Sequence, residues 1–241
     1  MTTLYQFPIS HFCEKARWAL DYKNIPYKTK NLLPGLHIKQ IMSMAKTSEV
    51  PVLKHENNVI QKSNKIIDYL DQQFPDNCLT PEGEGNRRKV KEWEAFADKE
   101  VGPNLRTYFY HTLLEFPELL IPIFTYKGPW YGKILMKFFF PILRKKMIKL
   151  MRINDATADE AKQRLKHAID KINLHLTEHK YLVGDQFSRA DLAVASLLAP
   201  LVQPEKYGLP WPSPLPPALQ TTIDEWSSEL EWVRLLYNEY R

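Results

Sequence analysis

Two serines stand where an expected helix begins, and such positions can do chemistry. Ser10 follows the short apolar run 3–7 and opens residues 10–22, in which apolar side chains recur at helical spacing. Ser63 lies at the start of a second helical run, 62–74. A helix N-terminus has free N–H groups and the positive end of the helix dipole, and both favour a bound anion. Serine is also a common N-cap residue, so capping alone is the alternative at both positions.

The turn at Ser10 also carries an imidazole and a thiol. His11 is of a type that titrates near neutrality, and we expect it to be an exposed loop histidine. Cys13 falls in the first helical turn and is one of only two cysteines, the other being Cys78. We expect Cys13 to be a small buried hydrophobe, with thiol chemistry as the alternative.

The elements that position these residues are expected to be strand, helix and strand, then a hairpin and a helix. Strands are predicted at 3–7 and 27–33 around the helix 10–22, and a short helix at 37–44. The hairpin comprises 50–53 and 59–60, and Pro75 stops the helix 62–74. On the first helix the residues expected to face outward are Lys15, Arg17 and Asp21.

Beyond a breakpoint near residue 80 that contains Pro and Gly, the pattern is helical throughout, which predicts domains at 1–78 and 86–241. Gly102 and Pro103 slightly interrupt the first helix, and four prolines break the helix within 117–141. The apolar run 188–201 predicts a central helix, with Ser188 and Asp191 as a capping box. The helices expected here are 87–110, 156–178, 188–201 and 223–237.

The composition is that of an ordinary globular protein. Of 241 residues, 44% are hydrophobic and 25% are charged. No charge-free run reaches the length of about eighteen residues that a membrane-spanning helix needs. With two cysteines and no signal-like start, a secreted disulfide-rich protein is not expected, and we expect a cytoplasmic one. No metal-binding set of side chains is predicted.

Positive charge is concentrated in one segment. Residues 119–154 contain eight Lys or Arg and no Asp or Glu, whereas the whole chain has a net charge of +5. Within them, residues 126–151 alternate aromatic and Met residues with cations. We favour a broken helix whose apolar face covers a pocket. The alternative is peripheral contact with an anionic membrane, where each cation contributes about 1 kcal/mol. A nucleic-acid partner is not expected, because no binding motif accompanies the charge.

Four stretches resemble cytosolic glutathione transferases: LYQFPISHFCEKARWAL at 4–20, SEVPVL at 48–53, QKSNKIIDYL at 61–70 and YLVGDQFSRADLAVASLL at 181–198. Their order and spacing carry the resemblance, which covers nearly the whole chain. It implies a thioredoxin-like α/β domain followed by an all-helical bundle domain. It further implies an enzyme that binds glutathione as co-substrate, stabilises its thiolate and conjugates it to an electrophilic apolar small molecule.

The resemblance also assigns roles to residues. Ser10 becomes the catalytic residue, since a hydroxyl at a helix N-terminus can hold a thiolate. Val50 and Pro51 match a cis-proline turn whose backbone pairs with the cysteinyl part of glutathione, and Ser63 receives the γ-glutamyl carboxylate. Lys62 replaces the usual Glu or Gln, so Gln61 is expected to compensate. The implied glutathione-binding set is Phe12, Val50, Pro51, Gln61, Lys62 and Ser63.

A pocket for the second substrate is implied between the two domains, against the first long helix of the second domain. The residues expected to line it are Arg106, Tyr108, Tyr110, His111 and Trp130. Most relatives form dimers across both domains, so a homodimer is implied, although the sequence offers no self-complementary patch.

Two alternatives to conjugation remain open. A glutathione-dependent thiol oxidoreductase would use Cys13, but Ser10 stands where redox-active relatives have the attacking cysteine, which makes this alternative less favoured. A non-catalytic protein of the same fold would use its basic amphipathic segment to bind a membrane or carry an apolar ligand.

Overall fold

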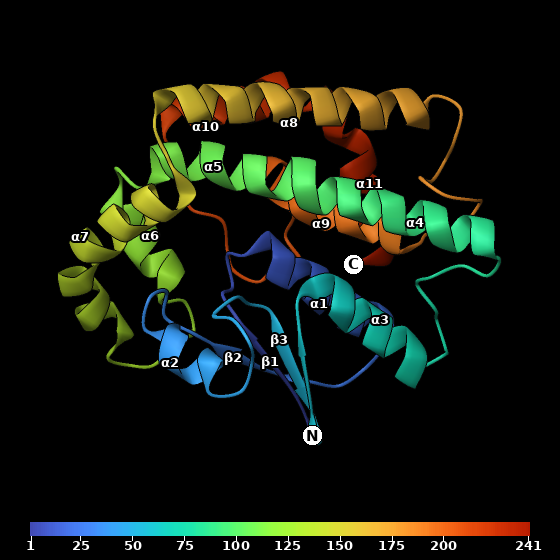
Figure 1. Cartoon of the computed structure of the whole chain (residues 1–241). Coiled ribbons are helices and arrows are strands. Elements are labelled where there is room, and N and C mark those ends of the chain that lie inside the picture. Colours follow the sequence, from blue (N-terminus) through green and yellow to red (C-terminus); the bar gives the residue numbers. More distant parts are fainter.

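The first part of the chain forms a small mixed sheet (Figure 1). In the computed structural model, which describes residues 1–241, the four strands lie in the order β2–β1–β3–β4. β1 is parallel to β2 and antiparallel to β3, and β3 and β4 form the predicted hairpin. The strands are β1 (Thr2–Gln6), β2 (Lys28–Asn31), β3 (Val52–His55) and β4 (Asn58–Gln61).

Three helices accompany the sheet: α1 (His11–Tyr22), α2 (His37–Met42) and α3 (Ser63–Gln73). α1 is the crossover that joins the parallel strands β1 and β2. It packs against α3 and also against α9 (Arg189–Val202) of the second part of the chain. The predicted order of strands and helices is therefore confirmed.

The second part of the chain is entirely helical, as predicted. Residues 74–83 contain no helix or strand, and the breakpoint expected near residue 80 falls there. In Figure 1, α4, α5 and α8 are long rods above the sheet, and α6 and α7 form one end of the molecule. No helix is both long and apolar enough to cross a membrane. Besides α9, the helices are α4 (Glu84–Phe96), α5 (Gly102–Leu113), α6 (Pro117–Phe124), α7 (Gly132–Met151), α8 (Asp155–Leu176), α10 (Pro217–Glu225) and α11 (Glu231–Tyr240).

α9 is the predicted central helix. All of its residues through Leu201 are buried. The backbone N–H of Ser188 and its hydroxyl each donate to Asp191 Oδ2 at 2.8 Å, and the N–H of Ala190 donates to Ser188 Oγ at 3.3 Å. The capping box is therefore confirmed, and it satisfies N–H groups that no carbonyl of the helix could reach.

Two helix predictions need correction. The helix expected at 87–110 is two helices, because a π-helical turn (Ala97–Val101) separates α4 from α5 directly before Gly102. The last helix, expected at 223–237, is α10, a 3₁₀ turn (Ser228–Leu230) and α11. Pro217 suits the first position of α10, because the N–H that proline lacks would have no partner within the helix there.

The prediction that Lys15 faces outward is wrong, because the second part of the chain covers α1. Lys15 is fully buried, and its Nζ lies 2.8 Å from Glu94 Oε1 and 2.8 Å from Asp98 Oδ1. Arg189 Nη2 donates to the other oxygen of Glu94 at 2.5 Å. An unpaired buried charge destabilises a fold strongly, so these ion pairs hold α1, α4 and α9 in one arrangement.

Arg17 is buried as well, against the same expectation. Its Nε donates to Glu14 Oε2 at 2.7 Å, and its Nη1 donates to Gln6 Oε1 at 2.6 Å. The guanidinium lies over the ring of Tyr207, with Cζ 5.3 Å from the ring centroid. Of the three side chains expected to face outward, only Asp21 is exposed.

One hydrophobic core runs through both parts of the chain, from Leu4 of β1 to Tyr237 of α11. Trp18 of α1 is fully buried, and its indole N–H donates to the carbonyl oxygen of Tyr240 at 2.9 Å. Its ring lies against Tyr237, with centroids 4.3 Å apart, and stacks on Phe187 at 5.8 Å. The sheet and the helical part are thus packed as one unit.

We predict that Glu94→Ala lowers the free energy of unfolding by about 3 kcal/mol, because two buried cations each lose a partner. Glu92, also on α4, is the matched control: it forms only an exposed ion pair with Arg88, 3.6 Å long, so Glu92→Ala should cost less than about 1 kcal/mol. Urea denaturation measures both variants. Equal costs would show that the buried pairs do not hold the two parts together.

Candidate functional site

A cavity of about 720 Å³ lies between the sheet domain, α5 and α7. Ser10, at the start of α1, lines it together with the turn at Pro51 and the start of α3. The structure therefore brings together eight of the predicted site residues: Ser10, Phe12, Val50, Pro51, Lys62, Ser63, Arg106 and Tyr110.

Ser10 is the N-cap of α1, with extended backbone angles. Its Oγ accepts a long hydrogen bond, 3.3 Å, from the backbone N–H of Cys13. The hydroxyl proton is used by no acceptor in the chain, so it is free to donate to a group in the cavity. Capping and anion binding are therefore compatible here, because one uses the oxygen and the other uses the proton.

The turn before β3 presents unused backbone groups to the cavity. The Val50–Pro51 peptide bond is cis, as the resemblance implied. Neither the N–H nor the carbonyl of Val50 hydrogen-bonds within the chain. Gln61 fixes this turn, because its Nε2 donates to the carbonyls of Thr47 and Glu49, at 2.8 Å each. An extended peptide can add to such a free backbone edge.

The start of α3 is open. Lys62 occupies the N-cap position with φ of 81°, and its side chain caps nothing. Ser63 is the first helical residue, so the prediction of Ser63 as the cap is wrong by one position. Ser63 is mostly buried, lines the cavity, and its hydroxyl forms no hydrogen bond within the chain. The first amides of α3 are therefore available to an anion such as a carboxylate.

His11 is not the exposed loop histidine that was expected. It is the first residue of α1 and is buried against α5. Burial, followed by the positive charge of Arg106, lowers the pKa of His11 to about 3. The imidazole is therefore neutral at physiological pH and is a weak proton acceptor.

Cys13 is completely buried, as predicted for a small hydrophobe. Burial is the main cause that raises the pKa of its thiol. A thiol with a raised pKa supplies little thiolate at neutral pH, and thiolate is the reactive form.

The opposite wall of the cavity combines apolar, aromatic and charged side chains. Arg106 of α5 is exposed there and forms no ion pair. Tyr110, one turn later, has its pKa raised to about 12, chiefly by burial. Four apolar residues of α7 complete this wall: Leu143, Met147, Leu150 and Met151. This agrees with the covering role expected of the basic segment, but the helix was expected to be broken, whereas α7 continues through Pro141.

Four expected site residues do not line the cavity. Gln61 uses its amide to hold the 47–49 turn, so it does not offer the compensating contact expected of it. Tyr108 is turned toward α10, where its hydroxyl lies 2.7 Å from Thr222 Oγ1. His111 is paired with Asp155, with Nε2 2.8 Å from Oδ1. Trp130 is 89% exposed, because it precedes α7 on the outer surface.

Sequence patterns missed four charged or titratable residues of the cavity: His37, Glu49, Asp98 and Lys146. His37 lies at the start of α2, where its Nε2 is 3.1 Å from the carbonyl oxygen of Ser48, and burial lowers its pKa. Asp98 reaches the cavity from the π-helical turn, and burial raises its pKa despite Lys15 nearby. No local motif marks these residues, because the tertiary fold alone brings them to the cavity.

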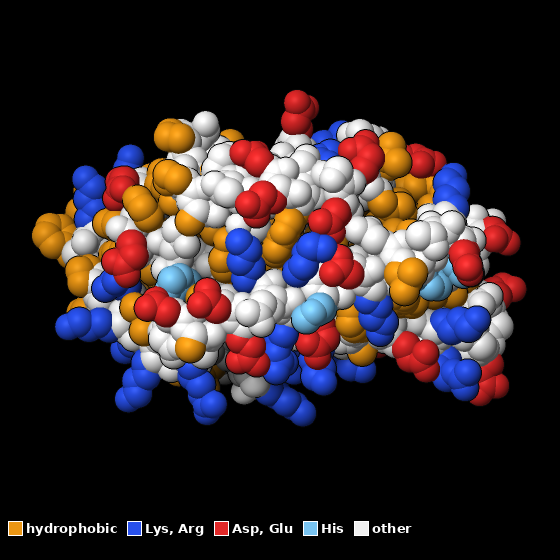
Figure 2. All heavy atoms as spheres, turned by 90° about the horizontal axis from the view of Figure 1, so that it is seen from above, with side chains coloured by type: hydrophobic (Ala, Val, Ile, Leu, Met, Phe, Trp, Pro, Cys, Tyr) orange, Lys and Arg blue, Asp and Glu red, His pale blue; other side chains and the backbone are white.

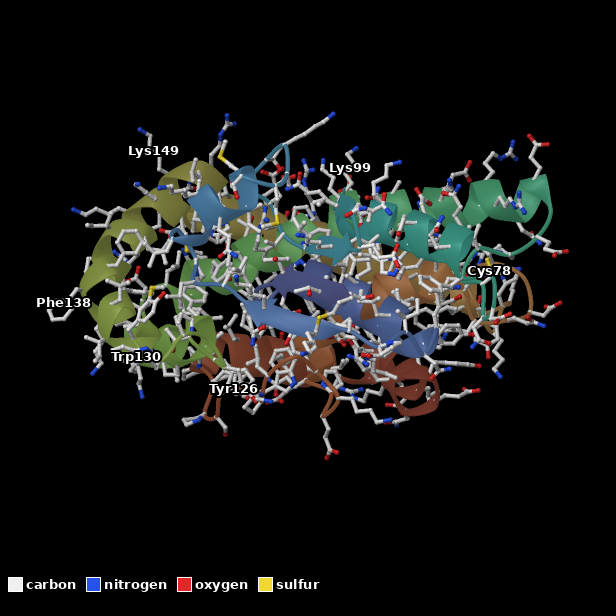
Figure 3. All side chains as sticks on the ribbon, turned by 90° about the horizontal axis from the view of Figure 1, so that it is seen from below. Cys78, Lys99, Tyr126, Trp130, Phe138 and Lys149 are labelled. Carbon is white, nitrogen blue, oxygen red and sulfur yellow. The ribbon has the colours of Figure 1, made fainter.

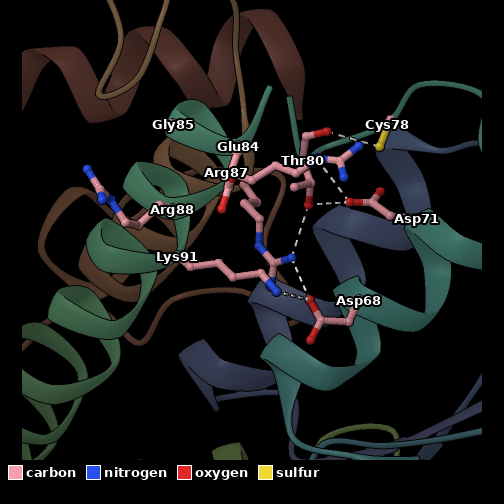
Figure 4. A pocket seen from close by; sticks show the side chains of 10 residues that line it. Asp68, Asp71, Cys78, Thr80, Glu84, Gly85, Arg87, Arg88 and Lys91 are labelled. Atoms are coloured by element: carbon pink, nitrogen blue, oxygen red, sulfur yellow. Dashed lines mark hydrogen bonds and ion pairs between the residues drawn. The ribbon is translucent and has the colours of Figure 1, made fainter. Parts of the chain in front are cut away.

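A second hollow, of about 930 Å³, lies where α3, α4 and α9 meet (Figure 4). Several of its polar groups are engaged with one another. Thr80 donates to Asp71 at 2.6 Å, and Arg189 donates to Asp68 at 2.7 Å. This hollow contains neither Ser10 nor the cis proline, and its hydrogen bonds join the two parts of the chain. We therefore place the chemistry in the first cavity. No group of three or more His, Cys, Asp or Glu side chains could hold a metal ion.

Acidification should destabilise the fold through His11. The pKa of His11 is about 3 in the fold and 6.5 in an ordinary histidine, so the unfolded chain takes up the proton first. The stability that neutral His11 contributes is complete above about pH 6.5 and is lost as the pH falls toward 3, at up to about 1.4 kcal/mol per pH unit.

Urea denaturation between about pH 7 and pH 4 tests this expectation. The variant His11→Gln should lose less stability on acidification than the parent chain, whereas His167→Gln, at an exposed histidine of α8, should follow the parent chain. Parallel curves for the parent and His11→Gln would contradict the buried neutral imidazole.

Comparison with known proteins matches both parts of the chain. The model of the glutathione S-transferase N-terminal domain matches residues 4–78, and that of the C-terminal domain matches residues 131–216, together more than half of the chain. Glutathione S-transferase TCHQD of Arabidopsis thaliana is 25% identical over 82% of this chain and 76% of its own length. Glutathione S-transferase U2 of the same plant is 29% identical over 42% of this chain, in an alignment that spans only 45% of U2.

Solved structures share the fold. The glutathione S-transferase of Methylobacillus flagellatus, crystallised with glutathione bound, superposes with a TM-score of 0.64 at 17% identity, covering 98% of this chain and 93% of that one. Because models of the two domains match in the family's own order, and the observed fold is that of these structures, the chain belongs to the glutathione S-transferase family.

Proposed function

We propose that this protein binds glutathione in the 720 Å³ cavity and conjugates it, through its sulfur, to an electrophilic, apolar small molecule. The observation that carries the proposal is the free hydroxyl proton of Ser10 at the start of α1, in the same cavity as the unpaired backbone of Val50. Ser10 can stabilise a sulfur anion, and the Val50 backbone can pair with a peptide as an added strand would.

The charged groups of the cavity suit a tripeptide with two carboxylates and one amine. The open start of α3 at Ser63 accepts the γ-glutamyl carboxylate. Lys62 and Lys146 supply positive charge for the carboxylates. Glu49 and Asp98 supply negative charge for the amine, a contact that Lys62 and Gln61 do not provide.

The chemical step needs the thiolate, and a thiol of pKa about 8.5 supplies only a few per cent of it at neutral pH. A hydrogen bond from Ser10 and the positive end of α1 stabilise the anion and so raise that fraction. The proton leaves to solvent, since the neutral imidazole of His11 has too low a pKa to take it. The sulfur then attacks the electrophile, forming a carbon–sulfur bond and expelling a leaving group or generating an adduct that is protonated.

The acceptor lies against the wall made by α5 and α7. Its apolar residues, among them Phe109, Leu143 and Met147, favour an acceptor with an extended apolar surface. Arg106 is placed to stabilise negative charge that develops on the acceptor, because it is exposed in the cavity and has no carboxylate partner.

We predict that Ser10→Ala lowers kcat at neutral pH by about 10- to 100-fold but changes glutathione affinity much less. Kinetics with an aryl halide measure turnover, and calorimetric titration measures affinity. Activity should recover toward high pH, where the thiol ionises unaided. Ser63→Ala is the matched control and should weaken glutathione binding more than turnover. Equal losses of turnover and affinity in Ser10→Ala would show that Ser10 only positions glutathione. If titration of the parent chain with glutathione released no heat, the proposal that it binds glutathione would be wrong.

We further predict that Cys13→Ala keeps most of the conjugating activity, because the buried thiol with its raised pKa takes no part in the reaction. Glutathione-dependent reduction of a small disulfide is measured in parallel. Loss of both activities in Cys13→Ala, with the fold intact by circular dichroism, would favour the oxidoreductase alternative instead.

A further inference from the structure

We propose that the outer face of α7 docks on an anionic lipid bilayer. This outer face comprises the exposed residues Trp130, Tyr131, Lys133, Ile134, Leu135, Lys137, Phe138 and Ile142. Half of all the large hydrophobic side chains exposed in the chain fall between residues 130 and 150. Such a concentration marks an interaction surface, whereas scattered exposed apolar residues do not.

Four exposed apolar residues recur at every fourth position. Trp130, Ile134, Phe138 and Ile142 have exposed fractions of 89, 62, 80 and 52%. Residues four apart lie on one side of a helix, so the last three form a stripe along α7, and Trp130 stands just before its start. Figure 3 shows Trp130 and Phe138 at the same end of the molecule, with Phe138 pointing outward.

Unpaired cations flank this stripe. Lys133 and Lys137 are exposed and form no ion pair, and the same holds for Lys145 and Lys149 further along α7. The nearest acids in the sequence are Glu118 and Asp155, outside the helix. In Figure 2, blue and orange side chains lie at the end of the molecule where α7 lies, with some red ones near them. The surface therefore offers apolar side chains and positive charge together.

The charge of this surface favours an anionic bilayer over a second copy of the chain as its partner. A second copy of the chain would bring two sets of unpaired lysines against each other, which is unfavourable in a desolvated interface. An anionic bilayer satisfies both features, since its headgroups attract the lysines and the region beneath them accepts aromatic and aliphatic side chains. Trp130 suits this boundary in particular, because indole has an apolar body and one N–H group.

The other face of α7 is already occupied, which fixes the side that can bind. Leu143, Met147 and Met151 line the cavity, and Phe139 lies so close to Gly35 that a Cβ there would be 2.8 Å from its ring. The outer face can therefore rest on a membrane without opening the cavity.

Co-sedimentation of the full chain with vesicles tests the proposal. We expect binding to vesicles of phosphatidylcholine with phosphatidylserine at low ionic strength, weakened by added salt, and little binding to phosphatidylcholine alone. The double variant Lys133→Glu/Lys137→Glu should bind about tenfold or more weakly. Its matched control is Lys28→Glu/Lys89→Glu, at two exposed lysines outside α7, which should bind like the parent chain.

A second pair of variants tests the apolar stripe. Trp130→Ala/Phe138→Ala should also lose binding, whereas Leu174→Ala/Leu235→Ala, at exposed leucines elsewhere, should not. All four residues are exposed, so each variant should remain folded. Absence of sedimentation at low ionic strength, or equal binding of every variant, would overturn the proposal. Loss of self-association in the apolar variant by sedimentation velocity, without vesicle binding by the parent chain, would assign the surface to a second copy.

Discussion

The burial of charged groups around α1 is the constraint on which the rest of the structure depends. Lys15 is enclosed between the sheet domain and the helical domain, and a buried ammonium is tolerated only with carboxylates beside it. Glu94 and Asp98 supply them from the helical domain, and Arg189 balances Glu94. Lys15 belongs to the sheet domain and its carboxylate partners belong to the helical domain. These ion pairs therefore fix the position of the two domains relative to each other.

That fixed position determines the cavity. α5 meets the start of α1 at Gly102, where a Cβ would lie 2.6 Å from the ring of Phe12. Any larger residue would force the Phe12 ring to move, and the π-helical turn directly before Gly102 ends α4 and begins α5. The contact buries His11, whose pKa falls, and leaves Ser10 at the edge of the cavity with its hydroxyl proton free. The ion pairs of Lys15 fix the two domains, Gly102 lets α5 approach α1, and this approach places Ser10 at the cavity.

Features set by nearby residues could be predicted from the sequence. The order of strands and helices, the capping box at Ser188 and the placement of Ser10 at a helix start all depend on short-range patterns. Predictions failed where a distant segment decides the environment: Lys15 and His11 look solvated on α1 alone, but the helical domain covers them. Gln61 was assigned to a ligand although the neighbouring turn already uses its amide. Hydrogen-bond partners of this kind are decided by tertiary structure.

The residues of α7 fall on two faces, and each face has its own role. The inner apolar residues line the cavity, so the cavity accounts for them. The cavity does not explain Trp130 and Phe138, because both are exposed and pack in no core. Exposed side chains of this size lower the solubility of a protein. Lysines along the same helix offset this effect in water, since they keep copies of the chain apart. Charge and apolar surface on one exposed face therefore point to a partner that is itself both anionic and apolar, which is the character of a lipid surface.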